Sequence, residues 1–85
     1  MACSPGRFVY LIQSDNDPTK WYVGNTDDVA RRLTEHNSGR SPFTSRYTPW
    51  QLRSTMEFAD SYRAIAFEKY LKSGSGRAFS RRHFR

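Results

Sequence analysis

Three short runs of β-branched, aromatic and aliphatic residues are spaced along the chain and predict β-strands. The first run covers residues 8–12 and the second residues 21–24, with a stretch dense in turn formers at residues 14–19 between them. Two such runs on either side of a turn favour an antiparallel hairpin. The third run, Trp50–Phe58, mixes apolar and polar residues and predicts a third strand.

Helical periodicity replaces the strand pattern in two places. The first helix is predicted to begin at Thr26 or Asp27, either of which can cap it, and to stop at the Asn-Ser-Gly sequence of residues 37–39. Its inward stripe recurs at i, i+4 and i+7 through Val29, Leu33 and His36. The second helix is predicted from an Asp60-Ser61 cap to about Leu71, ended by residues 73–76, with a basic last turn or helix at residues 77–85.

The predicted order β-β-α-β-α belongs to the α+β class: a small three-stranded antiparallel sheet flanked by helices. Eighty-five residues suffice for a single domain, residues 1–85, of which residues 69–85 form a basic C-terminal segment. Between the first helix and the third strand lie ten residues, 40–49, with two prolines. Loops near this length in small domains are often functional.

Composition supports a folded core and narrows the class of protein. Aromatic residues reach 15% although the mean hydropathy is −0.84, and disordered chains are poor in aromatics. The single cysteine, Cys3, excludes an intramolecular disulfide. Residues 1–7 lack the apolar stretch of a secretory signal, and no run approaches the roughly 18 apolar residues of a membrane span. We therefore expect a cytoplasmic protein without membrane insertion.

The net charge of +6 is confined to the end of the sequence. Residues 1–68 contain eight basic and eight acidic side chains. Residues 69–85 contain no acid and six cations: Lys69, Lys72, Arg77, Arg81, Arg82 and Arg85. Such blocks are typical of contacts with nucleic acid or an anionic membrane surface, and also of a solvated helix end. Charge alone leaves these alternatives open.

Arg32 and His36 are candidates for chemistry on phosphate. With Val29 at 0° on a helical wheel, Arg32 falls at about 300° and His36 at about 340°, at the rim of the apolar stripe. A half-buried arginine and histidine one turn apart can clamp a phosphate and transfer a proton. The alternative is ordinary helix chemistry, in which Arg32 pairs with Asp28 four residues earlier.

Glu68 and two strand tyrosines complete the set of candidates. With Ala64 at 0°, Glu68 lies at about 40°, on the core-facing side of the second helix, where an unpaired carboxylate is costly. A single carboxylate can bind Mg²⁺ together with water and a substrate phosphate. The alternatives are an i, i+4 ion pair with Lys72 and, for Tyr10 and Tyr22, simple packing in the strands.

Together these residues resemble the GIY-YIG nuclease family. Residues 8–10 (Phe-Val-Tyr) and 22–24 (Tyr-Val-Gly) match its two signature strands. Residues 22–37 place an arginine ten positions and a histidine fourteen positions after the second tyrosine, as family members do. Residues 44–50 and 68–74 resemble the short stand-alone bacterial members, which are similar to the nuclease module of the excision-repair incision subunit.

The resemblance implies a role for each candidate. Tyr10 would be the general base towards water, Tyr22 would lie beside it, and Arg32 would stabilise charge on the phosphate. His36 would assist proton transfer, and Glu68 would bind one divalent ion, Mg²⁺ or Mn²⁺. The five side chains are expected to line one concave patch, with Glu68 on the same face of the sheet as Tyr10. Many members carry an asparagine after the metal-binding glutamate, and none follows Glu68; Ser73, Ser75 and Ser80 are the candidates to substitute for it, and the sequence does not choose among them.

The leading hypothesis is therefore a metal-dependent endonuclease or nickase acting on branched, damaged or single-stranded DNA, in DNA repair or recombination. The backbone would be held by seven cations in the 40–49 loop and the basic segment: Arg40, Arg46, Lys69, Lys72, Arg77, Arg81 and Arg82. The alternative is a non-catalytic nucleic-acid-binding module, or a subunit that requires a protein partner.

Overall fold

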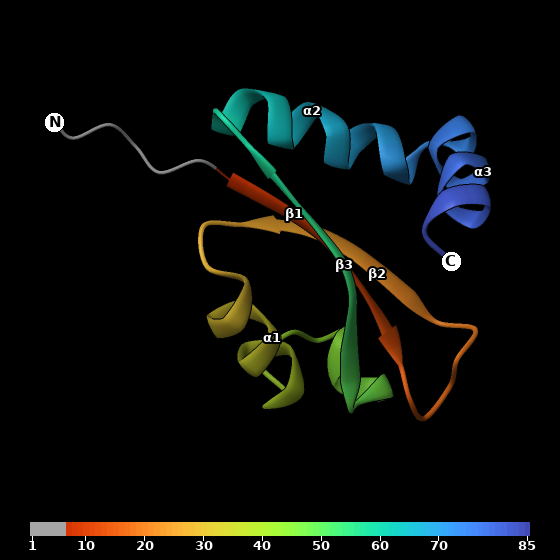
Figure 1. The fold of residues 1–85 in the computed structure, drawn as a ribbon. Helices are drawn as coiled ribbons and strands as arrows, with labels where there is room; N and C mark the ends of the chain where they lie inside the picture. Colours follow the sequence, from red (N-terminus) through yellow and green to blue (C-terminus); the bar gives the residue numbers. More distant parts are fainter. Residues whose placement is uncertain (1–6) are drawn as a thin grey trace, which may run out of the picture.

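A three-stranded antiparallel sheet forms the centre of the protein (Figure 1). The computed structural model describes residues 7–85, so Cys3 and the rest of residues 1–6 lie outside the described residues. The sheet has the order β2-β1-β3, which confirms the predicted hairpin and the α+β class. The elements in chain order are β1 (Arg7–Ser14), β2 (Trp21–Thr26), α1 (Val29–Asn37), the 3₁₀ turn η1 (Thr44–Tyr47), β3 (Trp50–Phe58), α2 (Ser61–Lys72) and α3 (Gly74–His83).

Helices cover both faces of the sheet (Figure 1). On one face α2 and α3 pack over a core that contains Val9 and Leu11 of β1 together with Leu71. On the other face α1 and η1 cover Tyr10 and Ile12. The central strand β1 is buried on both sides because its run of apolar residues supplies side chains to each layer.

The register of the strands places Tyr10 beside a glycine. Tyr10 is opposite Gly24 of β2 and Thr55 of β3. The pairing of β1 with β3 shifts by one residue between Leu11 and Ile12, whereas the pairing with β2 is regular. Within the described sheet, β2 therefore offers an open edge next to the side chain of Tyr10.

Helix α1 is capped by Asp28, one or two residues after the predicted position. The carboxylate of Asp28 accepts a hydrogen bond from the backbone N–H of Arg31 at 3.0 Å. Thr26 still belongs to β2, and Asp27 forms an ion pair with Arg31 at 2.8 Å. The predicted stop is confirmed: α1 ends at Asn37, and Gly39 has a positive φ of 84°.

The predicted cap of α2 is confirmed. Residues 73–76, predicted to end this helix, do not form an irregular segment, because α3 already begins at Gly74. Asp60 caps the helix through the N–H of Arg63 at 2.8 Å. Ser73 alone separates the two helices, and its hydroxyl caps α3 by accepting from Gly76 N–H at 3.1 Å. A Cβ at Gly76 would lie 1.8 Å from the Tyr70 carbonyl oxygen. Glycine therefore allows α3 to begin against the last turn of α2.

The 40–49 loop contains one element that the sequence did not predict, the turn η1. This turn buries Thr44 beneath the α1 face of the sheet.

No helix among residues 7–85 is long and apolar enough to cross a membrane.

Candidate active site

Tyr10 and His36 form a buried hydrogen-bonded pair on the α1 face of the sheet. The hydroxyl oxygen of Tyr10 lies 2.8 Å from Nε2 of His36, and the two residues are 2% and 0% exposed. Gly24 gives this hydroxyl its room, because a Cβ there would lie 2.5 Å from the Tyr10 oxygen. The absence of a side chain at Gly24 thus makes room for the hydrogen bond between Tyr10 and His36.

Thr44 is the second hydrogen-bonding partner of His36. Nδ1 of His36 lies 2.8 Å from Oγ1 of Thr44, and this hydroxyl donates to the carbonyl of Ser41 at 3.4 Å. A neutral imidazole carries one ring proton, and in the tautomer with that proton on Nδ1 the ring donates to Oγ1 of Thr44. Nε2 then carries the lone pair and accepts the proton of the Tyr10 hydroxyl.

Burial keeps both members of the pair neutral at pH 7. Burial raises the pKa of Tyr10 to about 12, although the neighbouring Arg32 acts in the opposite direction. Burial also lowers the pKa of His36 to about 4, and the positive charge of Arg32 lowers it further. The phenol is therefore protonated and the imidazole is a proton acceptor.

Arg32 lies at the rim of this pair, as its helical position predicted. Its Nη1 donates to Oε1 of Glu35 at 2.9 Å, and its side chain remains 32% exposed. The predicted alternative, a pair with Asp28, is wrong because the Asp28 carboxylate caps α1. The hydrogen bond to the Glu35 carboxylate and its negative charge raise the pKa of Arg32. A guanidinium has five N–H donors, so Glu35 leaves others for an anion.

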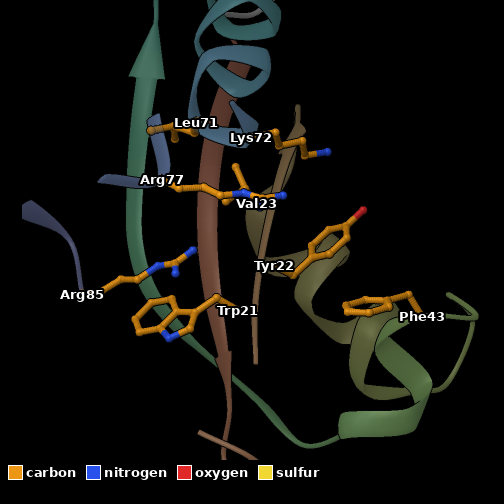
Figure 2. Close-up of a pocket in the computed structure, with 8 residues that line it drawn as sticks. All are labelled: Trp21, Tyr22, Val23, Phe43, Leu71, Lys72, Arg77 and Arg85. Atoms are coloured by element: carbon orange, nitrogen blue, oxygen red, sulfur yellow. The ribbon is translucent and has the colours of Figure 1, made fainter. Parts of the chain in front are cut away.

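Tyr22 carries the site to the open edge of the sheet. Its ring centroid lies 6.4 Å from that of Tyr10 and 5.0 Å from that of His36. The Lys72 ammonium lies 5.7 Å from the centroid of the Tyr22 ring. Figure 2 shows the Tyr22 ring between the side chains of Lys72 and Phe43. Tyr22 is half-buried and links the inner pair to the solvent.

Glu68 approaches the site from the other side of β2. It belongs to α2, so the expectation that it shares the face of Tyr10 is wrong. Its carboxylate accepts one hydrogen bond from the Asn25 side-chain amide and one from Lys72 Nζ at 2.7 Å. Because β2 is an edge strand, groups on both faces can approach one another around it. The negative charge of Glu68 reaches Tyr10 and contributes to its raised pKa.

The sequence of this site matches a family of known nucleases. A model of the GIY-YIG catalytic domain matches residues 7–82, nearly the whole described chain. The chain belongs to the GIY-YIG family. The structure brings four of the family's expected site residues together on the α1 side, Tyr10, Tyr22, Arg32 and His36, and places Glu68 at the edge of β2.

Known relatives of this GIY-YIG chain include both large and small proteins. It is 38% identical over 77 residues to the structure-specific endonuclease subunit SLX1 of Homo sapiens, covering 80% of this chain and 28% of that protein. It is 40% identical over 65 residues to a UPF0213 protein of Halobacterium salinarum, covering 75% of this chain and 82% of that protein. The chain spans 17–28% of the length of the SLX1 subunits that it matches.

A solved structure supports the fold. The solution NMR structure of a UPF0213 protein from Bacillus halodurans aligns with a TM-score of 0.54 and 30% sequence identity. The alignment covers 89% of this chain and 80% of that one. The three-stranded sheet with its flanking helices is therefore the arrangement of a GIY-YIG relative.

The donor set at Glu68 fits a divalent ion that keeps most of its water. No group of three or more His, Cys, Asp or Glu side chains that could hold a metal occurs among residues 7–85. Mg²⁺ commonly binds through one or two carboxylates and a substrate phosphate, with water completing its shell. Glu68 supplies such a carboxylate, with its side chain 15% exposed, and the predicted pair with Lys72 is also formed.

The seven predicted nucleic-acid contacts are all exposed and lie on several different elements. Lys72 and Arg77 lie beside Tyr22 in the same open cavity. Arg40 follows the end of α1 and lines a separate hollow with Glu35. Arg82 lies on α3 beside Phe79 and His83. The remaining three, on η1, α2 and α3, are Arg46, Lys69 and Arg81.

Two residues that contact the candidate side chains, Asn25 and Thr44, were not predicted from the sequence. Asn25 holds the Glu68 carboxylate and accepts a hydrogen bond from Arg7 at 2.6 Å. Thr44 orients His36 from the turn η1. The period-2 alternation of β2 places Asn25 on the α2 face, whereas no periodicity in the 40–49 loop indicates Thr44.

Proposed function

We propose that this chain is a divalent-metal-dependent endonuclease that hydrolyses phosphodiester bonds in DNA. The observation that carries the proposal is the hydrogen-bonded series Tyr10–His36–Thr44 beside Arg32. A buried phenol bonded to a neutral imidazole can move a proton inward, and a cation at its rim can bind phosphate. GIY-YIG membership and similarity to structure-specific endonuclease subunits support the assignment.

The chain's own residues would act as a proton relay and a phosphate clamp. A pKa of about 12 makes a preformed Tyr10 phenolate rare at neutral pH. Tyr10 would instead take a proton from the attacking water while its own proton passes to Nε2 of His36. Arg32 would donate hydrogen bonds to the phosphate oxygens as negative charge develops on them. Tyr22 would position the phosphate at the edge of β2.

Glu68 would hold the divalent ion, Mg²⁺ or Mn²⁺, with the Asn25 amide orienting the carboxylate. A bound ion supplies Lewis-acid stabilisation of the phosphate and of the departing 3′ oxygen. Lys72, released from Glu68, would then be free to contact the DNA backbone.

By similarity to the SLX1 subunits, we extend the proposal to branched, damaged or single-stranded DNA and to a role in repair or recombination. Those relatives are endonuclease subunits, so a protein partner that adds DNA contacts is part of the proposal.

A non-catalytic nucleic-acid-binding module is the second candidate. The observation that favours it is the Glu68 carboxylate itself, which is already satisfied by Asn25 and Lys72. In that case Glu68 stabilises α2 against β2 and the basic residues alone bind nucleic acid.

Incubation with supercoiled, branched and single-stranded DNA, with and without Mg²⁺ or Mn²⁺, distinguishes the two. The matched variant is Glu68→Gln, which keeps the size of the side chain but removes the charge that a hard cation needs. We expect metal-dependent cleavage by the natural chain, no cleavage by Glu68→Gln, and equal or slightly tighter DNA binding by the variant in chelator. Binding without cleavage by either protein would select the module, and undiminished cleavage by Glu68→Gln would remove Glu68 as the metal ligand.

A further inference from the structure

An open cavity lined by aromatic rings and cations lies next to the candidate active site (Figure 2). Its volume is about 360 Å³, within the range of small-molecule sites. The side chains that matter for its chemistry are Trp21, Tyr22, Phe43, Lys72, Arg77 and Arg85. Tyr22 belongs both to this cavity and to the tyrosine–histidine cluster, so the two sites are continuous.

The aromatic rings of this cavity are available for stacking. Phe43 is 47% exposed, and its ring centroid lies 6.1 Å from that of Tyr22 at an interplanar angle of 31°. At the other end of the cavity the Arg85 guanidinium lies 4.9 Å from the centroid of the Trp21 ring. Bases stack both on aromatic rings and on arginine guanidinium planes.

The charge of the cavity is positive. No acidic side chain lines it among residues 7–85, and neither Arg77 nor Arg85 forms an ion pair within that part of the chain. Burial and the positive charges of Arg81 and Arg77 lower the pKa of Arg85. Cations held close together without acids attract an anionic ligand.

We infer that this cavity binds an unpaired nucleotide of a polynucleotide, with the base against Phe43 or Trp21 and the backbone against Arg77 and Arg85. Aromatic faces interleaved with arginines are what single-stranded nucleic acid requires, whereas a duplex presents its bases edge-on and needs only cations. The inference rests on the proposed function in one respect. If phosphate reacts at Tyr10 and Arg32, the nucleotide bound in the neighbouring cavity belongs to a single-stranded part of the substrate.

The test is fluorescence anisotropy in chelator, so that no cleavage occurs. The probes are a fluorescein-labelled single-stranded DNA, a single-stranded RNA of the same sequence, and the corresponding blunt DNA duplex. Phe43→Ala is expected to weaken single-strand binding about tenfold, as loss of one stacked base does, and to leave duplex binding nearly unchanged. The matched control is Tyr62→Ala, which removes an aromatic ring that is 82% exposed on the first turn of α2, away from the cavity.

A second pair of variants tests the cations. Arg77→Gln with Arg85→Gln is expected to lower the ratio of single-strand to duplex affinity. The control is Arg53→Gln with Arg63→Gln, which removes the same charge from β3 and the start of α2 and should leave that ratio unchanged. Circular dichroism establishes that each variant is folded.

Tryptophan emission gives an independent readout. The chain has two tryptophans, and Trp50 is 2% exposed with its Nε1 donating to the Thr44 carbonyl at 2.8 Å. A change in emission on adding a ligand therefore reports on Trp21, which lines the cavity. We expect quenching by the single strand and little by the duplex.

The outcomes separate this inference from the proposed function. Tighter binding of DNA or RNA single strands that depends on Phe43 supports the inference, and the tighter of the two identifies the source of the nucleotide. Equal affinity for single strand and duplex, or equal effects of Phe43→Ala and Tyr62→Ala, overturns it, and the cavity is then a phosphate or peptide surface. Cleavage that survives this result leaves the nuclease assignment standing. Single-strand binding without cleavage removes only the nuclease assignment.

Discussion

The Tyr10→Phe variant is the sharpest test of the proton relay. The change removes one oxygen and keeps the ring that packs with Ile12 and Trp50. Nε2 of His36, a residue that is 0% exposed, then loses its partner at 2.8 Å. An unsatisfied buried nitrogen costs about 1–3 kcal/mol of unfolding free energy. A domain of this size should melt roughly 4–8 °C lower for each kcal/mol.

The loss in rate should exceed what this destabilisation can explain. If the Tyr10 oxygen accepts the proton of the attacking water, its removal lowers the cleavage rate about 10²–10⁴-fold, equivalent to roughly 3–5 kcal/mol of barrier. Native small domains have about 5–15 kcal/mol of stability, so the variant stays folded well below its melting temperature. The assay is single-turnover cleavage with excess enzyme, together with a thermal melt of the same sample.

Ser14→Ala is the matched control for stability. Its hydroxyl, 1% exposed, donates to the Tyr47 carbonyl at 2.6 Å, outside the relay. Its removal takes a partner from the part-buried Tyr47 carbonyl and from the Asp17 N–H at a similar cost, and cleavage should continue at close to the natural rate. Natural cleavage by folded Tyr10→Phe would refute the relay, as would an equal loss in the two variants.

Two further predictions concern pH and salt. The folded pKa of His36, about 4, lies below its unfolded value of 6.5, so the unfolded chain binds the proton first and stability falls as pH drops through that window. Between neutral pH and about 4.5, protonation of this residue should lower the free energy of unfolding by about 2–3 kcal/mol. Urea melts of the natural chain and of His36→Gln at each pH measure this loss as the difference between them. If the stability of the two proteins fell in parallel with pH, the buried neutral imidazole would be contradicted. Neutralising Arg77, Arg81 and Arg82 should weaken DNA binding at every sequence and reduce the slope of log K against log salt by about 2–3; an unchanged slope would make α3 a solvated surface.

Sequence alone was sufficient for the elements whose signal is local. The strand Trp50–Phe58 has the predicted bounds, and the Asp60 cap is confirmed, because alternation and capping depend on near neighbours. Helical spacing also placed Arg32 and His36 on the inner rim of α1. The cap of α1 was predicted wrongly because β2 continues to Thr26, so the choice among three adjacent polar residues depended on where the strand ended.

Tertiary structure alone decided how the candidate residues meet. The wheel of α2 turns Glu68 inward, yet only the position of β2 at the sheet edge brings its carboxylate to Asn25 and within range of Tyr10. Likewise, the link from His36 to Thr44 joins a helix to a turn within a loop without periodicity. Pairings of this kind depend on strand order and on the packing of layers, which join residues far apart in the chain. Sequence therefore determined the chemical groups and their local faces, and the fold determined which of them share a hydrogen bond.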